Sequence, residues 1–150
     1  MKGKIYFSLV LAFLAVSFVS CDRENEIKDD TSLIFSFHTT FQAGEVVNLK
    51  INANLTHSTV PRRQTTIRTN VEQWEYLKNA FDLEAFKNIG EGEEPEEIIV
   101  GSRNKVFTVT IDDETYTFTQ YASLNYKNDE NFQKMIPFFN AIRNLAWSFH

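Results

Sequence analysis

Residues 47–55 read Val-Asn-Leu-Lys-Ile-Asn-Ala-Asn-Leu, and apolar and polar side chains alternate through the whole stretch. Successive side chains of a strand point to opposite faces, so this pattern predicts a strand with one apolar and one polar face. Antiparallel sheets commonly have one packed face and one solvated face. The stretch therefore predicts an antiparallel sheet that is covered on one side only.

Other segments extend this sheet. Five of them carry strand signals: 33–41, 63–69, 98–100, 106–111 and 115–121. The segment 63–69 is rich in threonine, poor in apolar residues and preceded by Pro61, so we expect it at an edge of the sheet. Asp112 and Asp113 are typical of a hairpin turn between the last two strands.

Two helices are predicted to cover the apolar face. Thr69 and Glu72 have the spacing of a capping box, and the helix that they open continues towards Ile89, with Asp82 as a point of interruption and Gly90 as the stop. Asn128 or Asp129 caps a second helix, and Pro137 predicts a kink in it or a start near that residue. Its apolar face comprises Phe132, Met135, Ile136, Phe139, Ile142, Leu145 and Ala146.

These elements define an α+β fold in which an antiparallel sheet of about six strands has the order βββαβββα and two helices pack on one face. Residues 32–150 have the length of a single domain. Residues 22–31 are charged and polar, and they predict a flexible tether in front of that domain.

The first 20 residues have the organisation of an export signal. Lys2 and Lys4 precede an apolar run over 5–19, and Ser20 is a small residue directly before Cys21, the single cysteine of the chain. The apolar run is shorter than the roughly 20 residues that a membrane-spanning helix needs. Two other interpretations remain open, namely a secretory signal that leaves Cys21 as a free thiol and an uncleaved membrane anchor.

The segment Phe18-Val19-Ser20-Cys21 resembles the lipobox of bacterial lipoprotein precursors, although Phe18 stands where leucine is usual. The resemblance implies that residues 1–20 are removed by the lipoprotein signal peptidase and that Cys21 carries the lipid. Asp22 after the cysteine resembles the inner-membrane retention signal of enteric bacteria. The acidic residues that follow it resemble the surface-export signal of Bacteroidota lipoproteins. Together with the composition, this favours a Bacteroidota-like lipoprotein of the outer membrane.

Charge limits the partners of the mature chain. Loss of Lys2 and Lys4 with the leader leaves 13 basic residues against 20 acidic ones, a net side-chain charge of −7. An acidic protein is a poor ligand for nucleic acid, so no nucleic-acid partner is expected. The lipid anchor is expected to supply the contact with the membrane.

No catalytic, cofactor-binding or metal-binding residues are predicted. His38 and His57 are interpreted as surface histidines, the first on the polar face of a strand and the second in a loop, and no Gly-x-Ser-x-Gly or glycine-rich phosphate loop occurs. The five glutamates within 91–97 are a candidate calcium site. Because they lack the Asp/Asn alternation of calcium loops, we interpret them as a solvated charge run.

One basic cluster is a candidate partner-binding site. Arg62, Arg63 and Arg68 lie on or beside the predicted edge strand. Positive charge on an edge strand guards against unwanted strand pairing, but it also suits an extended acidic peptide or an anionic glycan. The predicted function is therefore a lipid-anchored envelope protein with a non-enzymatic binding or structural domain. The alternative is an envelope hydrolase or a carbohydrate-processing accessory protein.

Overall fold

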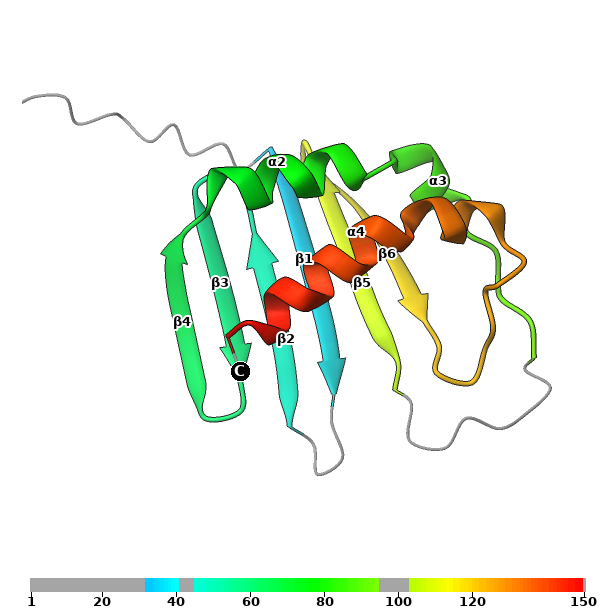
Figure 1. Ribbon diagram of the computed structural model, residues 1–150, viewed down its shortest axis with the longest axis horizontal. Coiled ribbons are helices and arrows are strands. Elements are labelled where there is room, and N and C mark those ends of the chain that lie inside the picture. The colour runs from blue at the N-terminus through cyan, green and yellow to red at the C-terminus, as the bar shows by residue number, and fades with distance from the viewer. Residues whose placement is uncertain (1–31, 41–44, 95–102, 150) are drawn as a thin grey trace, which may run out of the picture.

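Six strands form one antiparallel sheet in the order β4-β3-β2-β1-β5-β6 (Figure 1). A computed structural model describes residues 32–40, 45–94 and 103–149 of the chain. The strands are β1 (Leu33–Thr40), β2 (Val46–Ile51), β3 (Leu55–Val60), β4 (Arg63–Arg68), β5 (Lys105–Ile111) and β6 (Glu114–Gln120). β1 lies inside the sheet, because it pairs with β2 on one side and with β5 on the other.

Three helices lie on one face of this sheet (Figure 1). They are α2 (Val71–Ala80), α3 (Leu83–Lys87) and α4 (Glu130–Trp147). The longest helix, α4, crosses the sheet diagonally, contacts β1 and β2, and packs against both α2 and α3. The helices therefore form a second layer that covers the apolar side of the sheet.

Each helix begins at a side chain that satisfies its first backbone N–H groups. Asn70, Asp82 and Asp129 accept hydrogen bonds from the backbone N–H of the residue three positions later. Such caps supply acceptors that the first turn of a helix lacks. Asp82 both ends the extended link after α2 and starts α3, so the predicted interruption at this residue is confirmed.

Aromatic rings fill the space between the two layers. Phe35 in the middle of β1 is fully buried, and its ring lies 5.3 Å from that of Trp74 and 5.0 Å from that of Phe138. On the same face of the sheet, towards β5, the rings of Phe107 and Phe139 are 4.4 Å apart. Large aromatic side chains bury much apolar area, and this core holds together without a disulfide among the described residues.

The predicted fold class, an α+β fold with a six-stranded antiparallel sheet, is confirmed. The order along the chain differs in detail, since four strands precede α2 and the first predicted helix is two helices, α2 and α3. The predicted strand 98–100 lies outside the described residues, as do the leader, Cys21 and the tether.

The strand that the sequence did not predict is β3. The predicted strand 47–55 ends at Ile51, because the Asn52 side chain accepts hydrogen bonds from the backbone N–H groups of Asn54 and Leu55 and so forms a turn. The chain then returns as β3, which places His57 in the sheet. The prediction that His57 lies in a loop was therefore wrong.

Two details of the helices also differ from the prediction. Asn70, not Thr69, caps α2, while the Thr69 side chain is buried. Pro137 lies inside α4, which begins at Glu130 after the predicted cap Asp129. On the core side of α4, Phe138 is fully buried, whereas Ile136 of the predicted face is only half-buried.

Candidate functional site

One face of the sheet carries no helix. α2, α3 and α4 all pack on the same side, and within the described ranges no element covers the opposite side (Figure 1). That side, which we call the open face, is formed by every second residue of six segments. They are Ile34–Thr40, Val46–Lys50, Leu55–Thr59, Gln64–Arg68, Val106–Thr110 and Thr115–Thr119. The polar face predicted from residues 47–55 belongs to this surface.

The open face has a shallow recess near its centre. The recess has a volume of about 230 Å³, and its polar lining residues are Ser36, His38, Asn48, Lys50, His57 and Thr108. Strand pairing explains why they meet, since Lys50 lies opposite Ser36 on one side and His57 on the other. In the adjacent row, Asn48 lies opposite His38. The sheet thus brings together side chains from four different strands.

Both imidazoles of the open face are held by neighbouring polar side chains. Nδ1 of His38 donates to Oδ1 of Asn48 over 2.6 Å. Nε2 of Gln64 donates to Nε2 of His57 over 3.0 Å, and Nδ1 of His57 donates to the Thr66 hydroxyl over 2.7 Å. These roles follow from the orientation of the two amides. They place a proton on Nδ1 of each imidazole.

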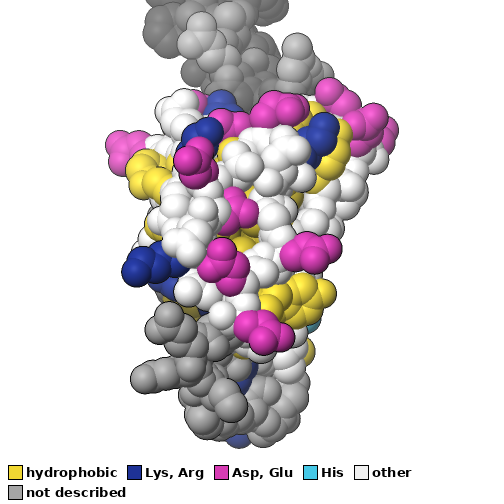
Figure 2. All heavy atoms as spheres, turned by 90° about the vertical axis from the view of Figure 1, so that its right-hand side faces the viewer, with side chains coloured by type: hydrophobic (Ala, Val, Ile, Leu, Met, Phe, Trp, Pro, Cys, Tyr) yellow, Lys and Arg dark blue, Asp and Glu magenta, His cyan; other side chains and the backbone are white. Residues whose placement is uncertain are grey.

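The open face carries positive charge and no carboxylate. Lys50 and Arg68 lie on it, and neither of them forms an ion pair within the described part of the chain. None of the strand residues that form this face is Asp or Glu. Figure 2 shows a different side of the molecule, where acidic side chains are spread over the surface among fewer basic ones. Among the described strand residues, none on the face that carries the recess is therefore acidic.

Threonines extend the polar surface beyond the recess towards β6. The hydroxyls of Thr108 and Thr117 are 3.3 Å apart, and those of Thr110 and Thr115 are 3.1 Å apart. These cross-strand pairs stabilise the β5–β6 hairpin and leave hydroxyl oxygens at the surface. The surface next to the recess is therefore rich in groups that both donate and accept hydrogen bonds.

The arrangement of Thr40, His38 and Asn48 resembles a hydrolytic relay in one respect. The Thr40 hydroxyl lies 3.5 Å from Nε2 of His38, whose Nδ1 donates to Asn48. A hydrolase also needs donors for the oxyanion that forms on its substrate. The backbone N–H groups of β1 face β2 and β5, so this strand offers little to such an intermediate.

The predicted arginine site is divided by the structure. β4 is an edge strand, as predicted, and the three arginine side chains are exposed. Arg62 lies in the β3–β4 turn, Arg63 is paired with Val60 on the helix side, and Arg68 is paired with Leu55 on the open face. Arg63 and Arg68 therefore project from opposite faces of β4 and do not form one cluster.

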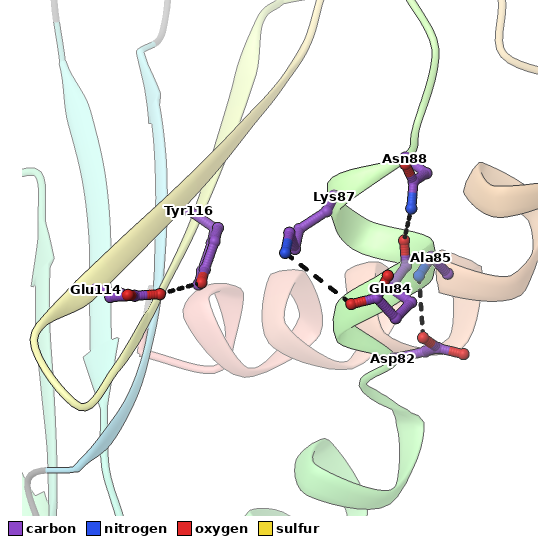
Figure 3. Close-up of polar contacts among 7 residues, drawn as sticks. All are labelled: Asp82, Glu84, Ala85, Lys87, Asn88, Glu114 and Tyr116. Carbon is purple, nitrogen blue, oxygen red and sulfur yellow. Dashed lines mark hydrogen bonds and ion pairs between the residues drawn. The ribbon is translucent and has the colours of Figure 1, made fainter.

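A polar cluster links α3 to the edge strand β6 (Figure 3). The ammonium group of Lys87 lies 5.2 Å from the centre of the Tyr116 ring and 3.9 Å from the Glu84 carboxylate. The Tyr116 hydroxyl donates to Glu114, and this hydrogen bond, followed by burial and by the charges of Glu114 and Glu84, raises the pKa of Tyr116. Each residue drawn in Figure 3 takes part in at least one of the hydrogen bonds or ion pairs shown.

The acidic segment is described only in part. Glu93 forms an isolated bridge with Asn125, and its carboxylate accepts a hydrogen bond from the Asn128 side chain over 2.9 Å. Residues 95–97 lie outside the described residues. Among the residues that the structure describes, no group of three or more His, Cys, Asp or Glu side chains is placed to hold a metal ion.

A groove also runs between α2 and α4. It has a volume of about 460 Å³, Leu77 and Leu145 contribute to its lining, and the Tyr76 side chain beside it is 56% exposed. Its other polar lining residues are Asn70, Glu72, Gln73, Asn144 and Ser148. No helix within the described ranges is long and apolar enough to cross a membrane.

The sequence matches no model of a known protein family, and a comparison with curated proteins finds no significant relative. The sequence placed His38 and Lys50 on a polar strand face, which the structure confirms. It did not indicate that His57, Gln64 and Thr108 join them. The signal that was available is the alternation Leu55, His57, Thr59 before the turn at Pro61.

Proposed function

We propose that this protein is a lipid-anchored envelope protein whose domain binds a ligand on the open face without transforming it. The observation that supports the binding role is the carboxylate-free, hydrogen-bonding face of an otherwise acidic domain. The polar residues at its centre come from four strands, and both imidazoles there are hydrogen-bonded, His38 to Asn48 and His57 to Gln64 and Thr66. These hydrogen bonds hold the two imidazoles in position before a ligand arrives, which lowers the entropy lost on binding.

The anchor is proposed from the sequence. Cys21 after a short apolar leader supports lipid attachment, and the polar residues 22–31 would hold the domain away from the membrane. Two or more acyl chains give stable membrane attachment, whereas one chain gives only marginal binding. In a bacterium that processes lipoproteins, the wild-type chain should incorporate radiolabelled palmitate, and Cys21→Ser should accumulate as an unlabelled precursor. Equal labelling of the two chains would refute the anchor.

The membrane and the exposed face can be tested separately. We propose the outer membrane, with the domain on either its periplasmic or its outer surface. Protease treatment of intact cells should remove a surface-exposed domain and spare a periplasmic one. A variant with neutral residues at Asp22 and Glu24 tests whether the acidic segment directs the chain to the surface.

The β4 edge is a second candidate surface, proposed for an envelope protein or peptide. It is favoured by the free edge of β4 and by the exposed side chains of Arg62, Arg63 and Arg68. Reversal of the three charges to Glu should abolish capture of such a partner, whereas Lys50→Glu should spare it. Unchanged capture by the triple variant would exclude the edge.

The hydrolytic alternative uses Thr40, His38 and Asn48. If it is correct, the purified chain should cleave activated esters, and His38→Gln should lose this activity while His57→Gln keeps it. We expect no turnover above the solvent rate by any of the three proteins. Turnover that depends on His38 would contradict the binding proposal and support the hydrolytic alternative.

A further inference from the structure

We propose that the recess around Lys50 binds the carboxylate or sulfate group of an acidic carbohydrate. This inference rests on the proposed function, because it assigns a ligand class to the open face. It differs from the arginine edge in place, since Lys50 lies in β2 and the arginines lie on or beside β4.

The Lys50 ammonium group lies among uncharged polar side chains near the centre of the open face. Lys50 lies between Ser36 and His57 in one row of the sheet, and in the neighbouring row lie His38 and Asn48. No described residue forms an ion pair with Lys50, and no carboxylate stands among the strand residues of the open face. A cation without an opposing carboxylate, surrounded by hydroxyl, amide and imidazole groups, is complementary to an anion.

The recess is too small for a whole ligand. Pockets that enclose a whole drug-sized ligand have volumes of about 300–1,000 Å³. The recess holds about 230 Å³, so it suits one charged group or one ring of a larger molecule. The rest of that molecule would lie on the surface of the sheet, where Thr108, Thr117 and their neighbours present hydroxyls.

The surface around the recess consists mainly of groups that both donate and accept hydrogen bonds. A polyhydroxylated ligand can exchange hydrogen bonds with the threonine, serine and amide groups that dominate it. An extended peptide would bind through its backbone, and unpaired backbone groups lie at the edges β4 and β6 and not on the face. A nucleic acid would need a strongly basic surface, whereas the domain is acidic. The surface therefore favours an acidic carbohydrate.

The test is a titration of the full chain in detergent with a galacturonate trisaccharide, followed by NMR and by calorimetry. The methyl ester of the same trisaccharide is the neutral control, and sodium sulfate is the control for a simple anion. We expect the acid form to shift the resonances of Lys50, Ser36 and Thr108. The ester should bind at least tenfold more weakly, and sulfate should also bind at least tenfold more weakly because it makes no hydroxyl contacts.

Matched variants locate the site. Lys50→Gln should raise the dissociation constant at least tenfold, while Lys134→Gln, which removes the same charge from exposed residues of α4, should change it less than twofold. Equal effects of the two variants, or equal affinity for acid and ester, would overturn the proposal. Equal affinity for sulfate and trisaccharide would overturn its carbohydrate part.

Failure of this inference is distinguishable from failure of the proposed function. If the trisaccharide does not bind but Thr108→Arg abolishes binding of another ligand, the ligand class is wrong and the open face remains the binding site. If Thr108→Arg and Lys50→Gln leave every ligand bound as in the wild type, the open face itself is excluded. Circular dichroism of each variant shows whether the fold is retained.

Discussion

The hydroxyl groups of Thr56 and Thr69 lie 3.0 Å apart in a buried hydrogen bond that joins β3 to the residue before the cap of α2. Both side chains are on the helix side of the sheet, where β1, β2 and β5 place mainly aromatic and aliphatic residues. Each hydroxyl satisfies the other, and no described buried side-chain nitrogen or oxygen lacks a partner.

Removal of one hydroxyl from this pair should destabilise the protein more than removal of both. Thr56→Val leaves the Thr69 hydroxyl buried without its partner, which costs about 1–3 kcal/mol of the free energy of unfolding. The double variant, with Thr69→Val, should lie close to the wild type because no polar group is orphaned. Urea denaturation of the four proteins measures this cycle. A double variant as unstable as the sum of the single ones would contradict it.

Arg62→Gly should stabilise the domain. Arg62 follows Pro61 in the two-residue β3–β4 turn and has φ 68°, a left-handed conformation that costs a residue with a Cβ roughly 1–2 kcal/mol. Glycine adopts it freely, although its freedom in the unfolded chain offsets about half of the gain. We expect a net gain of about 0.5 kcal/mol by thermal and urea denaturation.

Arg63→Gly is the control for this prediction. Arg63 is the first residue of β4, where glycine weakens a strand by roughly 0.5–1 kcal/mol. The two variants lose the same charge and should shift stability in opposite directions. Shifts of the same sign would show that charge, and not backbone conformation, controls the turn.

Asp129→Ala should destabilise α4 and remove the hydrogen bond that holds the backbone at Gly90. One oxygen of Asp129 accepts from the N–H of Phe132 over 2.8 Å, and the other accepts from the N–H of Gly90 over 2.6 Å. Loss of an N-cap alone costs about 0.5–2 kcal/mol. Hydrogen exchange should accelerate at Phe132 and at Gly90 together. Asp129→Asn, which keeps the cap oxygen, should protect Phe132 as in the wild type.

The pH dependence of Lys105 has a defined sign. Burial, and second the charge of Arg143, lower the pKa of Lys105 below its usual 10.5. The unfolded chain therefore binds this proton more tightly than the folded chain, so Lys105 destabilises the fold while both states are protonated. This penalty is relieved as the pH rises through the folded pKa towards 10.5.

Arg143→Gln tests this assignment. It removes the second cause of the shift, so the pKa of Lys105 should rise towards 10.5 in an NMR titration of its side chain, without reaching that value because burial remains. Lys134→Gln, elsewhere on α4, should leave the titration unchanged. An unaltered Lys105 pKa in Arg143→Gln would mean that burial alone lowers it.

The sequence predicted the fold class because its strongest signals coincide with buried faces. Phe35 and Phe37 in β1, and Val47 to Ile51 in β2, alternate so regularly that one face had to be covered. Asp129 and the apolar period after it predicted α4 in the same way. The turn at Asp112 and Asp113 was also predicted, and both residues have positive φ, as a tight hairpin turn requires.

β3 escaped prediction because two of its three inward residues are polar. Thr56 and Ser58 are almost fully buried, yet their hydroxyls find partners inside the protein, so hydrophobic alternation disappears from the sequence. The candidate site was not predicted either, because the recess forms only when His57 of β3 lies opposite Lys50 of β2. Strand pairing between distant segments decides which polar residues meet, and no local pattern contains that information.

The central position of β1 has a consequence for how the chain folds. β1 can pair with β2 as soon as residues 33–51 are available, but its other edge must wait for β5, where Leu33 meets Ile111. Until then a meander of four strands exposes one side of β1 and the faces of Phe35 and Phe37. An uncovered edge of this kind invites pairing with a second chain.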